Sequence, residues 1–225
     1  MQSPPLHRDD PTRTALAGNI KVTRDDWLRQ AMAVLIRDGV EGVKIQTLAV
    51  GMDVSRSSFY WYFKNREDLL GALLEAWENK NTAGLIDQAE APAGTITEAV
   101  CHIFACVVDG DLFDTALDFA IRDWARRDRY VRAALHRSDN RRLEALSEMF
   151  GRHGYAPDEA ATRARVLYFM QVGYDLAAPQ MDIEARLAMI PHYLRVFTGK
   201  EPLGAEVAAF SIFARKHWSS RNVQP

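Results

Sequence analysis

Apolar residues recur every three or four positions along most of the 225-residue chain. This spacing is typical of helices that bury one face, and no stretch alternates between apolar and polar residues as a half-buried strand does. Helices are predicted over 23–38, 45–52, 56–63, 65–81, 95–108, 112–125, 128–153, 157–177, 182–198 and 205–218. The pattern therefore predicts an all-α protein.

Residues that start or stop helices support several of these limits. Thr23 and Asp26 form a capping-box pair before the first helix, and Gly39 follows its last apolar position. The segment 83–94 has weak periodicity and contains a proline and a glycine, so we expect a linker there. Pro191 lies inside an otherwise helical pattern and is expected to kink that helix.

Two short predicted helices, 45–52 and 56–63, lie very close together in the sequence. Asp53 stands between them, and Asp tolerates the left-handed backbone angles that a sharp turn requires. Ser55 is a suitable N-cap for the second helix. Two short helices joined in this way are typical of a helix-turn-helix unit, whose second helix enters the major groove of DNA.

The second short helix carries an unusual outer face. Phe59 and Phe63 share one side and are expected to be buried, which leaves an arginine, hydroxyl groups and aromatic rings exposed. Arginine can fork onto guanine, and serine can bond to either type of base. The alternative is a solvated corner of a helical bundle. The candidate DNA-binding residues are Lys44, Gln46, Thr47, Ser55, Arg56, Ser57, Ser58, Tyr60, Trp61, Tyr62, Lys64 and Arg66.

Charge is unevenly distributed along the chain. The formal net charge is -2, which argues against a non-specific architectural DNA-binding protein, because that class is strongly basic. Between positions 44 and 66, however, Lys44, Arg56, Lys64 and Arg66 face Asp53 alone, a net charge of +3. Such a patch suffices for phosphate contacts, and a dimer would double it.

The same segment contains a series of paired residues in a recognisable register. They are Leu48-Ala49, Val54-Ser55, Phe59-Tyr60, Tyr62-Phe63 and Arg66-Glu67-Asp68-Leu69-Leu70. In this order they resemble the DNA-binding domain of TetR-family (tetracycline-repressor-like) transcriptional regulators. Asp53 stands where the family usually has a turn glycine, and Arg66 stands where it usually has a lysine.

The resemblance covers about a fifth of the chain and implies its general architecture. It implies an N-terminal three-helix helix-turn-helix DNA-binding domain followed by a larger helical ligand-binding and dimerisation domain. We expect a flexible arm over 1–20, the DNA-binding domain over 21–68, the helical domain over 69–200, and a C-terminal helix and tail over 201–225. The arm is either a simple disordered tail or a minor-groove contact.

One short reading helix covers few base pairs, so a dimer that reads two half-sites is expected. Members of the resembled family dimerise through a four-helix bundle of late helices, which here correspond to 157–177 and 182–198. The small and aromatic side chains for close packing on the first of these helices are Ala160, Ala161, Ala164, Leu167, Tyr168 and Gln171. The alternative is that these stripes are only intramolecular core.

The second domain has more aromatic and thioether side chains than a tight aliphatic core needs. An apolar pocket with a few polar groups is typical of small-molecule sites, so an effector pocket is expected. The candidate lining residues are His102, Phe104, Val108, Phe113, Phe119, Trp124, Tyr168, Met170, Gln171, Tyr174 and Asp175. Each of them could instead be ordinary core.

These observations favour a DNA-binding regulator, and a dimeric repressor released from a palindromic operator by a small apolar or amphipathic effector is expected. An activator remains an alternative, as does a helical interaction protein. No phosphate loop, nucleophile elbow or HExxH pattern favours an enzyme, and no cofactor is expected. Glu98, His102 and Cys106 share a helix face but span two turns, so no metal site is expected.

Two further features bear on the location of the protein. Cys101 and Cys106 lie five residues apart on one predicted helix, where they do not face each other well enough for a structural disulfide. No apolar run reaches the 18 residues that a membrane span needs, and no secretory signal follows Met1. We therefore expect a cytoplasmic protein that makes no membrane contact.

Overall fold

The computed structural model describes residues 22–177 and 181–221, without the side chains of 175–177 and 219–221. Every regular element in this part of the chain is helical, which confirms the all-α prediction. The expected arm over 1–20 lies outside the described residues. The elements are α1 Arg24–Asp38, η1 Val40–Gly42, α2 Ile45–Gly51, η2 Arg56–Trp61, α3 Arg66–Trp77, η3 Glu78–Thr82, α4 Ala83–Glu90, α5 Ile96–Val108, α6 Thr115–Ala125, α7 Arg129–Arg152, α8 Pro157–Ala177, α9 Ile183–Thr198 and α10 Gly204–Arg221.

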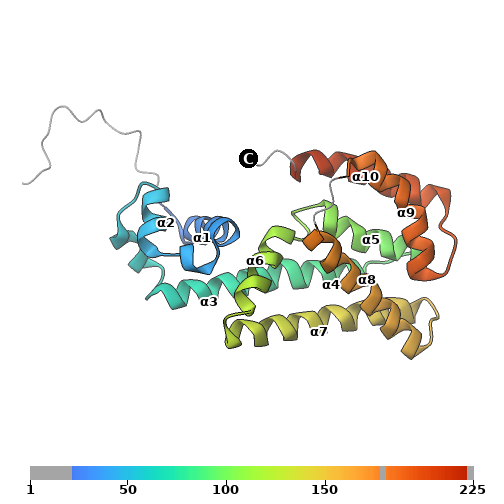
Figure 1. Cartoon of the computed structure of the whole chain (residues 1–225), viewed down its shortest axis with the longest axis horizontal. Helices are drawn as coiled ribbons and strands as arrows, with labels where there is room; N and C mark the ends of the chain where they lie inside the picture. Colours follow the sequence, from blue (N-terminus) through green and yellow to red (C-terminus); the bar gives the residue numbers. More distant parts are fainter. Residues whose placement is uncertain (1–21, 178–180, 222–225) are drawn as a thin grey trace, which may run out of the picture.

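The N-terminal unit lies at one end of the molecule and consists of α1, α2, η2 and the first part of α3 (Figure 1). Trp27 of α1 is fully buried, and its ring meets Phe59 of η2 edge-on at 5.2 Å. Phe59 also stacks on Phe63 at 5.4 Å. The capping box of Thr23 and Asp26 is confirmed at the start of α1. These contacts hold the short helices in a fixed arrangement.

The turn between α2 and η2 depends on the backbone angles of a single residue. Asp53 has a φ of 53°, and it is the one non-glycine residue of the described chain with a positive φ. This confirms the expected turn at Asp53. The Val54 N–H donates to the Ala49 carbonyl at 3.0 Å, and the Val54 side chain packs half-buried against the core. The turn thereby fixes the direction in which η2 leaves α2.

A longer helical rod than expected connects the N-terminal unit to the rest of the chain. The prediction of a linker over 83–94 is wrong, because α3 continues through η3, a π-helical turn, into α4 and ends at Glu90. Leu85 and Ala89 are buried in the second core, and this packing outweighs their weak local periodicity. Figure 1 shows the rod running from the N-terminal unit into the body.

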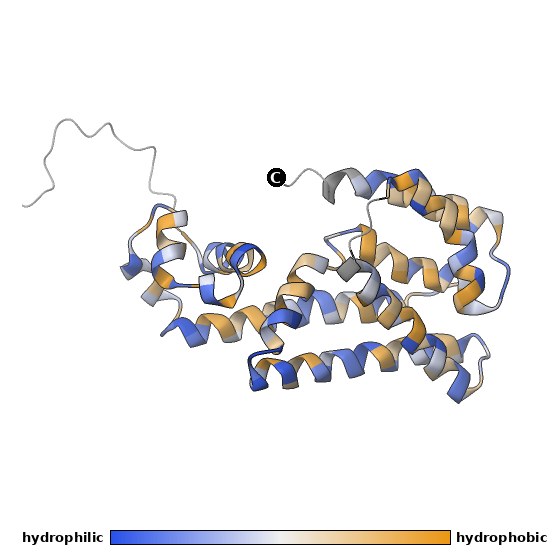
Figure 2. Cartoon of the chain, in the orientation of Figure 1, coloured by the Kyte–Doolittle hydropathy of each residue, from blue (hydrophilic) through white to orange (hydrophobic). Residues whose placement is uncertain are grey.

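The body consists of α4 to α10 around a second apolar core. Figure 2 shows α5 as mostly hydrophobic, and ten of its thirteen residues are buried. The helices predicted over 95–108, 128–153, 157–177 and 205–218 are confirmed within three residues at each end. Helix α6 begins at Thr115 rather than at 112, because the Asp114 side chain accepts the Leu117 N–H as an N-cap. Helix α9 contains Pro191 and ends at Gly199, which has a φ of 68°.

The two apolar cores are not divided at the domain limit expected near residue 68. Leu117, Ile121 and Trp124 of α6 belong to the first core, together with the buried residues of α1 and α3. The N-terminal unit therefore rests on α6 as well as on its own helices. Any movement of α6 or α3 within the body reaches the helix-turn-helix directly.

Gly84 marks a close approach between α4 and the loop before α6. A Cβ atom at this position would lie 2.3 Å from the Leu112 carbonyl oxygen, well inside van der Waals contact. Glycine to alanine in a helix ordinarily stabilises by up to about 1 kcal/mol. We expect Gly84→Ala to lower the free energy of unfolding by about 1–3 kcal/mol instead, because backbone must shift to make room.

Gly71 provides the matched control for this substitution in urea unfolding. It lies in α3 of the same rod, and its Cβ would meet open space. Gly71→Ala is expected to leave the protein equally stable or more stable. Equal effects of the two substitutions would show that the Gly84 contact does not limit packing.

Candidate nucleic-acid interface, effector pocket and the network between them

The outer face of η2 is the most exposed apolar and cationic surface of the N-terminal unit. Phe59 is fully buried, whereas 60% of Tyr60 and 74% of Trp61 are exposed. Arg56 and Ser57 are also exposed. Because η2 is only six residues long and is held from behind by Phe59, its remaining side chains all face away from the core. The outer face is therefore available to a partner.

Helix α2 adds further exposed groups next to η2. Lys44, Gln46 and Thr47, at and after its N-terminus, are exposed, as is Lys64 after η2. Sequence reasoning missed Val50, which is 68% exposed on the same helix. The signal was present, because Val50 falls outside the buried stripe of Leu48 and Ala49, but an isolated exposed valine is common.

The serines of the turn are used differently from the expected cap. Ser55 precedes η2, but its side chain makes no capping hydrogen bond to the helix. Its Oγ instead lies 2.7 Å from Ser57 Oγ, and Ser58 Oγ donates to the Ser55 carbonyl at 2.7 Å. The expectation of a capping side chain is therefore wrong. The short 3₁₀ helix is closed by Ser58 instead.

Two of the twelve candidate DNA-binding residues point inward. The Tyr62 hydroxyl donates to the Val22 carbonyl at 2.7 Å, which ties η2 to the start of α1. Arg66 donates from Nε to the Val43 carbonyl and from Nη2 to the Val40 carbonyl, both at 2.6 Å. These partners lie more than 20 positions away in sequence, so no local pattern signals them. We leave both residues out of the proposed interface.

The N-terminus of α3 is also partly occupied by the chain itself. The Asn65 side chain accepts the Asp68 N–H at 2.8 Å, which confirms the expected cap. The Asp68 carboxylate accepts the Lys64 N–H at 2.9 Å. The Lys64 side chain therefore remains as the exposed cation at this helix end.

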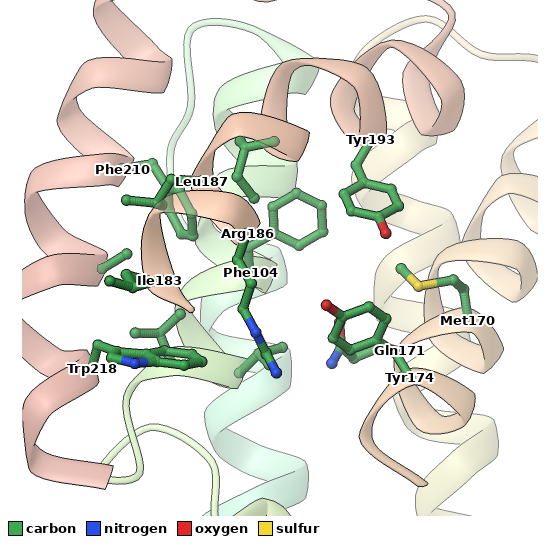
Figure 3. A pocket seen from close by; sticks show the side chains of 14 residues that line it. Phe104, Met170, Gln171, Tyr174, Ile183, Arg186, Leu187, Tyr193, Phe210 and Trp218 are labelled. Carbon is green, nitrogen blue, oxygen red and sulfur yellow. The ribbon is translucent and has the colours of Figure 1, made fainter. Parts of the chain in front are cut away.

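A hollow of about 600 Å³, partly open to solvent, lies between α5, α8, α9 and α10 (Figure 3). Three of the sequence-predicted lining residues, Phe104, Val108 and Gln171, line it, and so do Met170 and Tyr174. Sequence reasoning missed the contribution of α9 and α10, since their apolar stripes were attributed to dimerisation and to the C-terminal segment. The lining residues from these helices are Ile183, Arg186, Leu187, Ile190, Tyr193, Phe210, Ala214 and Trp218.

A second hollow of about 530 Å³ lies on the other side of α5, between helices α4 to α8. Phe113, Phe119 and Tyr168 of the predicted set line this hollow, and Gln171 lines both. The structure thus divides the predicted pocket into two chambers.

Three candidate pocket residues lie elsewhere or outside the description. Trp124 belongs to the core of the N-terminal unit, because α6 packs on α1 and α3. His102 is half-buried on α5 and lines neither hollow. The Asp175 side chain lies outside the described residues.

The stripe of α8 that was a candidate for dimer packing is intramolecular. Ala160, Ala164, Leu167 and Tyr168 are each no more than 4% exposed in the single chain. The opposite side of α8 is exposed at Val166. The stripe chosen from the sequence is therefore core, and any contact with a second chain must use the other face of this helix.

A cluster of charged side chains is buried between α6, α7 and α8, next to the second hollow. Arg122 donates from Nε to Asp118 at 2.8 Å and from Nη2 to Asp139 at 2.8 Å. Arg142 is fully buried and donates from Nη1 to Asp118 and to the Tyr168 hydroxyl, both at 3.0 Å. Tyr168 donates to Asp139 at 2.6 Å. Each charge in this ionic cluster therefore has an opposite charge as a partner.

The ionic cluster also holds the connecting rod. The Trp77 Nε1–H donates to Asp118 at 2.9 Å, and Arg142 Nε donates to Thr82 Oγ1 at 3.1 Å. The Arg142 guanidinium lies over the Trp77 ring at 5.1 Å and over the Phe113 ring at 5.2 Å. The ionic cluster thus joins the π-helical turn of the rod to a wall of the second hollow.

The ionisation of the cluster follows from these contacts. Burial alone would raise the pKa of the Asp118 carboxyl, but the Arg142 and Arg122 guanidinium groups outweigh it and hold the pKa below its ordinary value of 3.8. Burial raises the pKa of Tyr168, so its hydroxyl remains protonated and can donate to Asp139. The cluster is therefore fully charged at neutral pH.

The cysteines and the expected metal alternative can be placed directly. Cys101 and Cys106 are free and buried, and burial raises the pKa of each thiol to about 12. The Glu98 carboxylate accepts the Gly94 N–H at 2.6 Å. Within 22–177 and 181–221, three or more His, Cys, Asp or Glu side chains nowhere gather as a metal site would require. None of the described helices combines the length and the apolar character that crossing a membrane requires.

Comparisons with known proteins agree with the N-terminal geometry. The family model described as "Bacterial regulatory proteins, tetR family" matches residues 28–73. Tetracycline repressor protein class C of Escherichia coli is 39% identical over 56 residues, which are 25% of this chain and 26% of that protein. The matched region therefore spans about a quarter of this curated relative.

Solved structures match over most of the chain. The reduced form of Escherichia coli NemR aligns with a TM-score of 0.58 at 19% identity, over 82% of this chain and 100% of NemR. FadR of Bacillus subtilis in complex with stearoyl-CoA aligns with a TM-score of 0.56 at 15% identity, over 78% of this chain and 98% of FadR. At these identities the likeness establishes a common fold.

The fold and the site define a class of protein, a helical transcriptional regulator with a helix-turn-helix unit at one end and a hollow helical body at the other. Through its N-terminal domain, the chain belongs to the tetR family of bacterial regulatory proteins.

Asp118→Asn tests the ionic cluster, since the variant keeps the shape of the side chain and removes its charge. We expect a loss of about 3–5 kcal/mol in the free energy of unfolding near pH 6, because Arg142 is left without its buried partner. The folded-state pKa of Asp118 is lowered, so its contribution is present at neutral pH and is lost as the pH falls below 3.8.

Urea unfolding between about pH 6 and pH 3 measures both effects, and the variant should show a flatter acid dependence than the original chain. Glu144→Gln, an exposed change on α7, is the control and should leave the curve unchanged. Parallel acid curves for Asp118→Asn and the original chain would contradict the assigned role of this carboxylate.

Proposed function

We propose that the protein is a sequence-specific DNA-binding transcriptional regulator, acting as a dimeric repressor rather than as an enzyme. One observation carries the proposal: the family-matched helix-turn-helix exposes Arg56, Ser57, Tyr60 and Trp61 on the helix that would enter the major groove. An arginine can read guanine there, and the rings can contact thymine methyl groups or the backbone. Lys44 and Lys64 on either side supply cations for phosphates.

A second copy of the chain is the proposed partner of α8 and α9. Val166 of α8 is 51% exposed and Val196 of α9 is 71% exposed, and both line one groove on the surface. Phe169 and Met189 on the same two helices are 48% and 38% exposed. Apolar side chains gathered on two neighbouring helices suit a four-helix interface between identical chains. A dimer of this kind would present two reading helices to two half-sites.

The hollow between α5, α8, α9 and α10 is the proposed effector site. Its lining is mostly aromatic and aliphatic, as in small-molecule pockets. FadR, which shares the fold, was solved with stearoyl-CoA, so this fold accommodates a ligand in at least one protein. We propose a small apolar or amphipathic effector for this chain.

The ionic cluster supplies the proposed link between effector and DNA. A ligand that displaces α8 moves Tyr168, whose hydroxyl contacts Arg122, Arg142 and Asp139. Arg142 in turn holds Thr82 in the π-helical turn of the rod. A shift of the rod would change the distance between two reading helices and weaken DNA binding. By thermodynamic linkage, DNA must weaken the effector by the same factor.

Selection of random duplex DNA on the purified chain tests the proposed function. We expect an enriched palindrome, held by an even number of chains when the complex is measured by sedimentation. Binding should weaken steeply with salt, because phosphate contacts release counterions. If no sequence is enriched at low salt, the regulator proposal fails.

Arg56→Ala is expected to weaken binding to the selected operator by at least about tenfold, since one good base contact contributes about 1–3 kcal/mol. Fluorescence anisotropy with a labelled operator measures the effect. Arg137→Ala is the matched control, because Arg137 is exposed on α7, away from the helix-turn-helix. Equal affinities of the two variants would remove Arg56 from the interface.

Val196→Glu is expected to convert the dimer to a monomer at micromolar concentration, since the change buries an unpaired carboxylate at the proposed contact. Sedimentation velocity measures the oligomeric state. Ile212→Glu provides the control, because Ile212 is equally exposed, at 69%, but lies on α10. A dimer that survives Val196→Glu and dissociates with Ile212→Glu would place the interface elsewhere.

A further inference from the structure

The two hollows of the body meet at a single polar side chain. Gln171 of α8 and Val107 of α5 line both of them, and the other lining residues belong to one hollow each. A molecule in the first hollow that extends toward the second must therefore pass the Gln171 amide. Gln171 lies three positions after Tyr168, so the same helix carries a member of the ionic cluster.

The Gln171 amide is not satisfied by the described part of the chain. Its Nε2 atom is buried and has no hydrogen-bond partner there. Leaving a buried donor without a partner is unfavourable, and an apolar residue of similar size would avoid that cost. The unpartnered donor at the meeting point of two cavities is best explained by an acceptor that a ligand brings.

The charge in the first hollow favours a negatively charged acceptor. Arg186 of α9 projects between Trp218 on one side and Tyr174 with Gln171 on the other (Figure 3). Its guanidinium lies 4.7 Å from the Trp218 ring centroid and 5.2 Å from the Tyr174 ring centroid. Aromatic rings hold this cation within an otherwise apolar lining. Hydrogen bonds to an ionised acceptor are stronger than those to a neutral one.

We infer that the effector is an amphipathic organic anion, with an apolar body in the first hollow and a carboxylate-like or sulfonate-like group that accepts from the Gln171 amide. The inference rests on the proposed function for the word effector, but the binding site stands on its own geometry. The anionic group lies next to the helix segment that carries Tyr168, so the residue that reads the ligand and the residue that contacts the ionic cluster share α8.

Two fluorescent probes with one ring skeleton test the inference. 1-Anilinonaphthalene-8-sulfonate carries an anionic sulfonate, and N-phenyl-1-naphthylamine is the same molecule without it. Titration of the full chain with each dye gives two dissociation constants. In Gln171→Leu we expect the sulfonate dye to bind about tenfold or more weakly, and the neutral dye to bind equally well or better.

Two further variants define where the dyes bind. Ala214→Phe and Ile190→Trp each fill the first hollow and should weaken both dyes. Gln46→Leu is the matched control, since it makes the same chemical change at an exposed position of α2 and should alter neither dye. Urea unfolding without dye checks the fold, and Gln171→Leu should unfold at the same or a higher urea concentration because it removes an unpartnered donor.

The outcomes separate this inference from the proposed function. Unchanged sulfonate binding in Gln171→Leu overturns the inference, and so does unchanged binding of both dyes in the two filled variants. Operator selection with the dye-free chain is run in parallel. Failure of that selection with the expected dye pattern rejects the regulator and keeps the anion site, and the reverse result rejects the anion site alone.

Discussion

The buried contact between Arg142 and Asp118 is the interaction on which the rest of the structure depends. Arg142 is fully buried, so its charge is tolerable only because Asp118 and the cluster around it provide opposite charge and hydrogen bonds. The same guanidinium holds Thr82 and lies over Trp77. A charge that must remain paired thereby fixes how the connecting rod sits against α6, α7 and α8.

This constraint explains why the N-terminal unit and the body behave as connected parts. The rod is a continuous helical path from Arg66 to Glu90, and α6 contributes to the apolar core of the N-terminal unit. A displacement in the body can therefore reach the reading helix by two routes, along the rod and through α6. Packed helices transmit such displacements because close-packed interiors do not absorb them.

The proposed ligand site lies at the other end of the same path. Tyr168 and Gln171 are neighbours on one side of α8, and one contacts the ionic cluster while the other faces both hollows. The arrangement places an unpartnered donor close to a fully partnered network. A ligand that satisfies Gln171 would act on a helix whose position the cluster already determines.

Local chemistry allowed the sequence by itself to determine the helices, the capping box at Thr23, the turn at Asp53 and the outward face of Arg56 to Trp61, since each depends on residues a few positions apart. Only the tertiary structure decided the extension of the rod to Glu90, the inward roles of Tyr62 and Arg66, and the lining that α9 and α10 give the hollow. These features depend on partners 20 to 110 positions away, and spacing along one helix carries no information about which distant surface will cover it.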